Sequence, residues 1–425
     1  MPEVDVIVQI GGEDVLAGRM WVHRHRGRES ATFRYLPDYV ARDDAYALDP
    51  ALPLLEGPQQ TPEGRSTFGA FSDCAPDRWG RRLIQRTERR RALREEVTER
   101  SFGEADYLLG VRDDLRQGAL RFRDPESGAY LADEQAGVPD LIELPVLLRA
   151  AESMERDEAD EEELRRLLRG GSSLGGARPK AHVIAANGRV AIAKFPSPAD
   201  DWEVMRWEAV ALELARAAGI GVPDSALHEI AGRAVLIVDR FDRRGELRIG
   251  YVSAMTMLEA GDGDAGCYRD VADAIELHSN HTGEELRQLW RRIVFSVLIS
   301  NTDDHLRNHG FLRRSTAGWS LSPAFDLNPD PEPGPKALST AIDYGTDAAS
   351  LDVLLDVAEH FRLDTEEAEA TIGEVAAATR DWRSAAKGAG IERPEIDRMA
   401  PAFEHEQAEH ARSIAEGSAR RFGAA

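Results

Sequence analysis

Two aspartates, two histidines and two asparagines lie within the nine residues 301–309, whose sequence is NTDDHLRNH. Carboxylate, imidazole and amide groups can bind a metal ion, exchange protons or help to hold a phosphate. The cluster follows the apolar run IVFSVLIS, which indicates that it begins where a buried element ends. Which of these chemistries applies depends on the residues that the remainder of the chain supplies.

The spacing between Asp303 and Asn308 favours phosphoryl transfer. Four residues separate them, as in the catalytic loop of protein kinases, where the aspartate accepts a hydroxyl proton and the asparagine binds magnesium. The His-Arg pair that precedes the kinase aspartate is absent, and Ser-Asn-Thr stands there instead. Only Asp303 has the required spacing, so Asp304 is predicted to be a helper or a loop-capping residue.

A zinc site is the main competing interpretation. His305 and His309 are four residues apart and flank the same loop as Asp303, and two histidines at this spacing bind zinc when they share a helix face. Gly310 follows directly, which disfavours a regular helix at this point. Asparagine and aspartate are also common turn formers, so a purely structural loop is a third interpretation.

A glycine-rich stretch, SSLGGARPK at residues 172–180, is a candidate phosphate cradle. Adjacent glycines let backbone N–H groups approach phosphate oxygens closely, and Arg178 and Lys180 add positive charge. The Walker A spacing is missing, and taken alone the stretch is more simply an ordinary loop.

Lys194 ends the apolar run VAIAK, where a lysine needs a partner or a ligand. The order strand, lysine, helix, glutamate matches the kinase arrangement in which a helix glutamate orients the phosphate-binding lysine, and Glu208 is the candidate partner. An exposed edge-strand lysine is the alternative. Asp326, in SPAFDLNP, stands where kinases carry a metal-binding aspartate, and with Asn308 it offers the oxygen ligands that magnesium prefers.

The elements that must position these residues change from strand-rich to helical along the chain. Short apolar runs predict strands near the start, followed by an arginine-rich helix whose interleaved glutamates indicate a solvated face. Asn187-Gly188 predicts a hairpin, residues 201–219 an amphipathic helix and residues 233–243 a buried strand. Beyond residue 253 the pattern is mostly helical.

The bulk composition limits the classes of protein. With 425 residues the chain can form two or three domains, and 53 basic against 76 acidic residues argue against nucleic-acid binding over the whole surface. The two cysteines, Cys74 and Cys267, have no metal-like spacing and fit a reducing compartment. We see no signal-type start and no apolar run of the roughly 18 residues that span a bilayer, so a soluble cytoplasmic protein is expected.

Six ordered motifs resemble the HipA-type serine/threonine kinases, the toxins of bacterial toxin–antitoxin pairs: SSLGGARPKA, AIAKFP, EAVALELARAAGIGVP, LIVDRFDRR, NTDDHLRNHGFL and LSPAFDLNP. The resemblance implies an α+β, protein-kinase-like fold of two lobes, with a strand-rich N-terminal subdomain and a mostly helical C-terminal lobe. The expected parts are a HipA-like N-terminal subdomain at 1–125, an acidic helical linker at 126–170, a nucleotide-binding N-lobe-like part at 171–252 and a helical C-lobe with the catalytic loop at 253–425.

The resemblance also implies roles for individual residues. Asp303 would be the general base, and Asn308 and Asp326 would bind Mg²⁺. Ser173 falls where the family carries an inhibitory autophosphorylation serine, and Ser172 adjoins it. The ATP site would comprise Gly175, Gly176, Ala177, Arg178, Pro179, Lys180, Lys194, Asp239, Arg240, Phe241, His305, Leu306, Arg307, Asn308, Phe325 and Asp326.

The family further implies ATP and Mg²⁺ as cofactors, a protein substrate, and a helix-turn-helix antitoxin that binds operator DNA and holds the kinase inactive. An aminoacyl-tRNA synthetase is suggested as the substrate by family analogy alone. The net charge of −23 agrees with a kinase that reaches DNA mainly through that partner. Two alternatives are a nucleotide-binding corepressor without turnover and a small-molecule kinase. A scaffold would not need Lys194, Asp303, Asn308 and Asp326 together, which argues against the corepressor.

Overall fold

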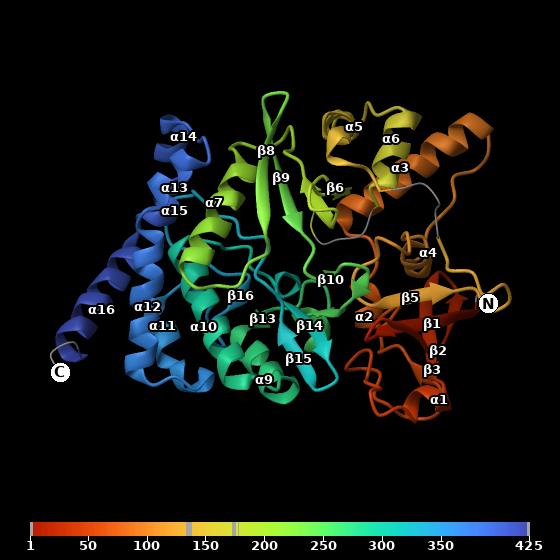
Figure 1. Cartoon of the computed structure of the whole chain (residues 1–425), viewed down its shortest axis with the longest axis horizontal. Coiled ribbons are helices and arrows are strands. Elements are labelled where there is room, and N and C mark those ends of the chain that lie inside the picture. Colours follow the sequence, from red (N-terminus) through yellow and green to blue (C-terminus); the bar gives the residue numbers. More distant parts are fainter. Residues whose placement is uncertain (1–2, 133–137, 172–175, 177, 423–425) are drawn as a thin grey trace. The chain divides into compact units, whose positions relative to one another are not determined.

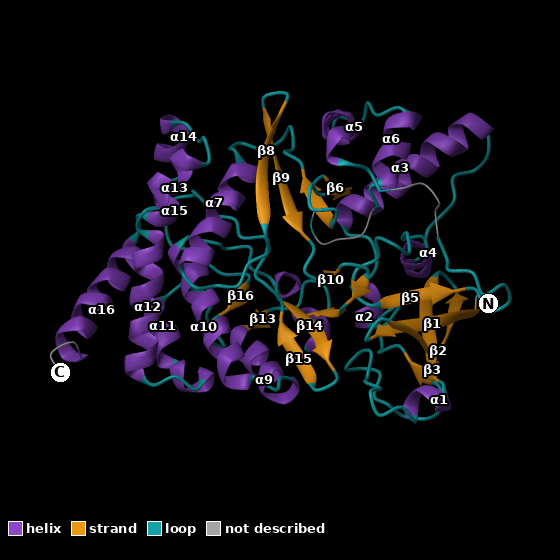
Figure 2. Ribbon diagram, viewed as in Figure 1, coloured by secondary structure: helices purple, strands orange, loops and turns teal. Residues whose placement is uncertain are grey.

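The chain divides into two compact units, which are described one at a time. The computed structural model describes residues 3–132, 138–171, 176 and 178–422. The first unit comprises Met1–Ala199, His228–Glu259 and Leu312–Thr316, and the second comprises Asp200–Leu227, Ala260–Phe311 and Ala317–Ala425. Figure 1 traces the chain and Figure 2 shows helices together with strands. This mixture confirms the predicted α+β class.

The first unit opens with a five-stranded antiparallel sheet in the order β4-β3-β2-β1-β5. Its core is aromatic: the rings of Phe33 and Phe71 meet edge to face at 5.8 Å, as do those of Phe71 and Phe122 at 5.6 Å. The strands are β1 Glu3–Ile10, β2 Glu13–His25, β3 Arg28–Tyr35, β4 Gln59–Gln60 and β5 Leu120–Arg123, with helices α1 Pro37–Val40, α2 Gly69–Ser72 and α4 Glu104–Leu109.

A second sheet of the first unit packs against three helices. It has the order β6-β7-β9-β8, and Asn187-Gly188 forms the turn of the β6–β7 hairpin as predicted. Its strands are β6 Lys180–Ile184, β7 Val190–Lys194, β9 Arg233–Asp239 and β8 Ser225–Ile230, of which β8 enters the unit at His228. The helices are α3 Arg78–Glu95, α5 Leu144–Glu155 and α6 Glu161–Arg169, preceded by η1 Leu141–Glu143.

The acidic segment at residues 144–169 contributes apolar side chains to this core and charged side chains to the surface. Leu148 of α5 and Leu167 of α6 are buried with Val183, Ala193 and Val235 of the sheet. The acidic side chains of residues 152–163 are exposed or half-buried. The segment therefore anchors α5 and α6 to the strands by one apolar face while its charges face solvent.

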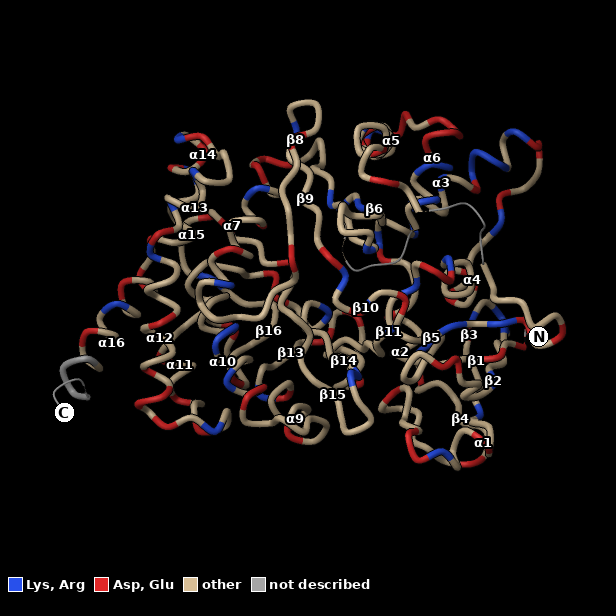
Figure 3. The backbone as a smooth tube through the Cα atoms, in the orientation of Figure 1, with Lys and Arg blue, Asp and Glu red and all other residues tan. Residues whose placement is uncertain are grey.

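The arginine-rich helix α3 is neutralised by nearby carboxylates. Arg91 lies 2.7 Å from Glu88 and 2.6 Å from Glu95, and Arg94 contacts Glu95 and Glu161. Figure 3 shows the basic positions of α3 close to acidic ones. This pairing supports the solvated-face interpretation over a nucleic-acid site.

A buried charge network joins the segment after β9 to residues 115–118. The Arg240 guanidinium contacts both oxygens of Asp242, at 2.9 and 2.6 Å, and Arg243 lies 2.9 Å from the same carboxylate. Arg240 also donates to the Leu115 carbonyl at 2.8 Å, and the Gly118 N–H donates to Asp242 at 2.8 Å. The remaining elements of the first unit are β10 Arg243–Arg244, β11 Leu247–Arg248, β12 Gly250–Ser253 and α8 Ala254–Met257.

Acidification is expected to destabilise the protein through His182 of β6. This side chain is buried, and Nδ1 lies 2.8 Å from the Gly170 carbonyl, so Nδ1 carries the proton and donates it. Burial, aided by the charge of Arg240, lowers the pKa of His182 to about 3. A histidine in the unfolded chain has a pKa of about 6.5. Between this pH and the pKa of the folded protein, His182 is therefore protonated in the unfolded chain and neutral in the folded one.

The stability contributed by neutral His182 is complete above pH 6.5 and is lost progressively as the pH falls toward 3. Between pH 7 and pH 5 we expect a loss of about 2 kcal/mol from this group, measured by urea denaturation. His182→Asn should flatten the dependence, whereas His25→Asn at an exposed position should not. Equal pH slopes in the wild type and His182→Asn would contradict the assignment.

The second unit is mainly helical. Its aromatic core stacks Trp382 on Phe403 at 4.6 Å, with Trp207 of α7 beside them. The predicted amphipathic helix is α7 Val204–Ala217, and Gly219 follows it with a φ of 75°. The other helices are α9 Tyr268–His278, α10 Thr282–Leu298, η2 Leu306–Asn308, α11 Leu351–Asp356, η3 Ala358–Phe361, α12 Thr365–Thr379, α13 Trp382–Gly388, α14 Arg393–Arg398, α15 Ala400–Phe403 and α16 Glu406–Phe422.

Short strands interrupt these helices: β13 Gly266–Cys267, β15 Gly318–Leu321, β16 Thr340–Ala341, and β14 Gly310–Ser315, which continues into the first unit. β13 and β16 pair in parallel. Each unit contains one buried cysteine, Cys74 in the first and Cys267 in the second. Among the described residues no helix is both long and apolar enough to cross a membrane.

Candidate active site

The loop that carries the candidate base starts at the buried end of α10. Phe295 and Leu298 belong to the apolar core, and the helix ends where Ser300 adopts a left-handed backbone with a φ of 54°. The Asn301 N–H returns to the Ser296 carbonyl at 2.8 Å. A buried helix end therefore fixes the point from which residues 301–309 leave the core.

The structure brings Asp303 and Asn308 together in one compact loop. The Asp303 side chain is exposed, whereas Asn308 is buried. Nδ2 of Asn308 donates to the Asp303 main-chain carbonyl at 3.1 Å, and the His305 N–H donates to the same carbonyl at 2.9 Å. Because the amide nitrogen of Asn308 is used in this way, its Oδ1 atom faces another direction and can serve as a ligand.

Asp326 lies in a second loop that is tied to the first. Its backbone has a φ of 59°, a conformation that aspartate adopts at an energetic cost and that clusters at functional sites. The Asn328 N–H donates to Oδ1 of Asn301 at 3.2 Å, and Nδ2 of Asn328 donates to the Asp326 carbonyl at 3.2 Å. Asn301 and Asn328, for which no separate role was predicted, bridge the two loops.

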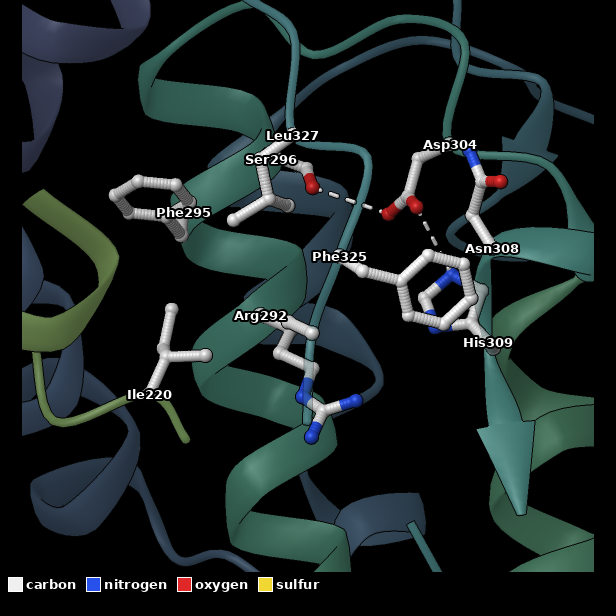
Figure 4. Close-up of a pocket in the computed structure, with 10 residues that line it drawn as sticks. Ile220, Arg292, Phe295, Ser296, Asp304, Asn308, His309, Phe325 and Leu327 are labelled. Atoms are coloured by element: carbon white, nitrogen blue, oxygen red, sulfur yellow. Dashed lines mark hydrogen bonds and ion pairs between the residues drawn. The ribbon is translucent and has the colours of Figure 1, made fainter. Parts of the chain in front are cut away.

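A small cavity lies beneath both loops (Figure 4). Its volume of about 10 Å³ leaves room for about one water molecule. Asn308, Phe325 and Arg292 are among the side chains that line it. Arg292 of α10 donates to the Ser322 carbonyl at 2.6 Å, and burial lowers its pKa to about 10. Helix α10 thus holds the start of the Asp326 loop from below.

Of the two roles predicted for Asp304, a helper or a loop-capping residue, its contacts do not match the loop cap. Its carboxylate is buried and accepts hydrogen bonds from Tyr268 and Ser296, side chains of two helices, instead of from loop N–H groups. Its other oxygen lies 3.1 Å from Nε2 of His309, at an angle that makes this contact electrostatic rather than a well-directed hydrogen bond. Burial opposes ionisation, but these partners outweigh it and lower the pKa of Asp304.

The other members of the predicted His305–Asn308 group face different surroundings. Leu306 packs against Gly266, where an added Cβ would approach it to 2.7 Å. Arg307 pairs at 2.7 Å with the exposed carboxylate of Asp262, a contact that contributes little in water. Nδ1 of His305 is buried and has no hydrogen-bond partner within the described chain. Among these three residues His305 is therefore the one whose chemistry is left available for a ligand.

In the first unit, Lys194 and Lys180 are direct cross-strand neighbours in the β6–β7 pair. Like charges in that relation repel. Lys180 is compensated by Asp77, whose carboxylate lies 2.8 Å from Nζ and also caps α3 by accepting the Gly80 N–H at 2.6 Å. Lys180 therefore ties the end of the glycine-rich stretch to α3, and the phosphate-binding role of Lys194 stays a prediction from the sequence.

Several predicted residues lie outside what the structure describes. These are Ser172, Ser173, Gly175 and Ala177. Of their neighbours, Gly176 is exposed with a φ of 120°, which requires glycine, Arg178 is half-buried and Pro179 is buried. Glu208 is buried in α7 of the second unit, whereas Lys194 belongs to the first, so their pairing remains a prediction.

The segment Asp239-Arg240-Phe241 is part of the predicted ATP site, where the resemblance implies that it contacts adenine. The Arg240 side chain is enclosed in its network with Asp242, and the Asp239 carboxylate accepts from Asn187 at 3.1 Å. Phe241 is half-buried. Any adenine contact therefore falls to the main chain of this segment or to Phe241.

Comparisons with known proteins define the class. Residues 172–382 match the family of the HipA-like C-terminal domain. The structure resembles HipA of Shewanella oneidensis MR-1, solved with HipB and operator DNA, with a TM-score of 0.65 and 17% identity over 99% of this chain and 97% of that one. The mixed helix-and-sheet fold is therefore that of HipA. Residues 172–382 of the chain belong to the HipA-type family.

Two further relatives match a smaller share of this chain. A candidate kinase of Haemophilus influenzae is 25% identical over 187 residues, which cover 38% of this chain, and the chain spans only 54% of that protein. The proinflammatory kinase CtkA of Helicobacter pylori aligns with 59% of this chain and 94% of its own, at 17% identity and a TM-score of 0.45, which is too low to support an argument about the fold.

Proposed function

We propose that this protein is an ATP- and Mg²⁺-dependent kinase that transfers a phosphoryl group to a serine or threonine hydroxyl of another protein. The observation that carries the proposal is the paired-loop geometry: an exposed Asp303, a buried Asn308 bound to its main chain, and a strained Asp326 in the adjoining loop. An exposed base can be reached by a hydroxyl on a macromolecule, which favours a protein substrate over a small enclosed one.

The chain's residues fit the proposed metal. Oδ1 of Asn308 and the Asp326 carboxylate are hard oxygen donors, the type that Mg²⁺ takes together with phosphates and water. Bound Mg²⁺ would neutralise charge on the transferring phosphates. Asp303 would accept the proton of the attacking hydroxyl, and Lys194 would hold the phosphates of ATP.

The test is intact-mass spectrometry after incubation with ATP and MgCl₂, with and without candidate protein substrates. We expect a mass gain of one phosphate on a protein. Autophosphorylation at the predicted Ser173 would disappear in Ser173→Ala, with Ser172→Ala as the neighbouring control. Phosphate found on a metabolite would support a small-molecule kinase, and nucleotide binding without turnover would support a corepressor; either result would overturn the proposal.

We further propose a DNA-binding antitoxin as the inhibitory partner. The similar Shewanella protein was solved with HipB and operator DNA, and the acidic surface implied by a net charge of −23 disfavours direct DNA binding. The protein alone should leave operator DNA unshifted in an electrophoretic assay, and a helix-turn-helix partner should produce a complex that contains both proteins. A shift by the protein alone would contradict this assignment.

A further inference from the structure

The Asp304 side chain contacts two helices of the second unit and His309, and its main chain contacts a strand. One carboxylate oxygen accepts hydrogen bonds from the hydroxyl of Tyr268 in α9, at 2.5 Å, and from that of Ser296 in α10, at 3.0 Å. The other oxygen lies 3.1 Å from Nε2 of His309, which directly precedes β14. The Asp304 main-chain carbonyl accepts the Thr340 hydroxyl of β16 at 2.7 Å.

Burial makes these contacts obligatory. Asp304 is only 4% exposed, and a buried carboxylate without partners is strongly disfavoured. The two hydroxyl donors approach from separate helices and His309 from the residue before a strand, and Figure 4 shows Ser296 and His309 on different sides of the carboxylate. Residue 304 can therefore satisfy its partners in one orientation only.

That orientation determines where the neighbouring side chains point. Asp303 and Asp304 lie outside regular helices, and the first is exposed while the second is buried. From Asp304 the chain passes through the short helix η2 to Asn308, whose amide returns to the Asp303 carbonyl. With Asp304 directed inward, Asp303 is directed outward and Asn308 is brought beneath it.

We propose that Asp304 is the positioning residue of this centre: its buried carboxylate, held by Tyr268, Ser296 and His309, sets the directions of Asp303 and Asn308. The kinetic part of this inference rests on the proposed kinase function, whereas the ordering of the loop rests on the geometry alone. Asp304 acts through its neighbours and contacts neither ATP nor the hydroxyl that is phosphorylated.

Asp304→Asn tests the inference because it preserves the shape and one acceptor oxygen but removes the charge that faces His309. Misplacement of reacting groups by about 1 Å can cost about 10²-fold in rate. We expect kcat to fall by about 10- to 100-fold while KM for ATP changes by less than about threefold. Amide hydrogen exchange in residues 300–310 should become faster, and exchange within α10 should not.

Companion variants separate positioning from general stability. His309→Gln should lower kcat in the same way, and the double variant with Asp304→Asn should lose less than the product of the single effects, because the two act as a pair. Tyr35→Phe is the matched control: it removes a buried hydroxyl bond to the Leu52 carbonyl, 2.8 Å long, in the first unit. It should reduce stability without changing kcat or the exchange of residues 300–310.

The two proposals fail in different ways. Faster exchange in Asp304→Asn with no phosphate transfer by the wild type would overturn the kinase proposal and retain the ordering role. A folded Asp304→Asn with wild-type kcat, or with unchanged exchange in residues 300–310, would overturn the positioning role. If Asp304→Asn does not fold, Tyr268→Phe and Ser296→Ala each remove one donor and leave the carboxylate in place, and unchanged kcat in both would overturn it.

Discussion

Asp303→Asn is expected to lower kcat for phosphoryl transfer from ATP by about 10²- to 10⁴-fold, the usual contribution of a positioned general base. An asparagine at this position cannot accept the proton of the attacking hydroxyl. KM for ATP should change little, because the proposed phosphate contact of Lys194 and the metal ligands Asn308 and Asp326 are retained. The loss should therefore appear in kcat and in kcat/KM together, as for an interaction made only in the transition state.

The substitution should leave the fold intact. Asp303 is exposed, and surface substitutions usually change the free energy of unfolding by no more than about 0.5 kcal/mol. Asp356→Asn, at an exposed position of α11, is the matched control and should retain full activity. Initial rates of labelled-phosphate transfer, measured for both variants and the wild type, decide the matter. An Asp303→Asn rate within about threefold of the wild type would remove this residue from the chemistry.

Asp242→Asn is expected to lower the free energy of unfolding by about 3–5 kcal/mol, the usual loss when one partner of a buried ion pair is removed. The Asp242 carboxylate compensates Arg240 and Arg243; Asp242 and Arg240 are buried, and Arg243 is half-buried. Burial raises the pKa of Asp242, but the two guanidinium groups outweigh it and hold the pKa well below its usual range. An asparagine would leave two cations in the interior with a neutral partner.

An exposed ion pair provides the control for Asp242→Asn. Asp44 contacts Arg42 at 2.7 Å, with about a third of each side chain accessible to solvent. Surface pairs of this kind contribute about 0–1 kcal/mol, so Asp44→Asn should have a small effect. Urea denaturation of both variants should give a lower midpoint for Asp242→Asn at an unchanged slope. Equal midpoints would show that the buried network does not stabilise the first unit.

Local sequence patterns predicted the elements of the fold well. The Asn187-Gly188 turn and the apolar periodicity that ends at Gly219 involve residues close together in the chain, so the physical rules that they follow are visible in the sequence. The spacing of Asp303 and Asn308 is local for the same reason, because the two residues share one loop. The packing of the acidic segment was not predicted, because its many charges indicated a solvated linker although its leucines pack α5 and α6 against the sheet.

Partners from distant parts of the chain could not be predicted. Lys180 pairs with Asp77, which lies 103 residues earlier in the chain. This contact compensates the charge that Lys180 was predicted to add to the glycine-rich stretch. The buried contacts of Asp304 could not be predicted, because its hydrogen-bond donors, Tyr268 and Ser296, come from two helices elsewhere in the chain. The direction of the Arg240 side chain likewise depends on the Leu115 carbonyl. Such contacts exist only after the elements have packed.

The two buried cysteines allow the opening of each unit to be timed in the unmodified protein. Burial raises the pKa of the Cys74 thiol to about 12, and Cys267 is also shielded from solvent. Thiol reagents attack the exposed thiolate, so labelling must wait until the surrounding structure transiently opens. Because Cys74 belongs to the first unit and Cys267 to the second, peptide mapping of the label measures the opening rate of each unit separately. Adding ATP should slow the labelling of the cysteine in the unit that the nucleotide rigidifies.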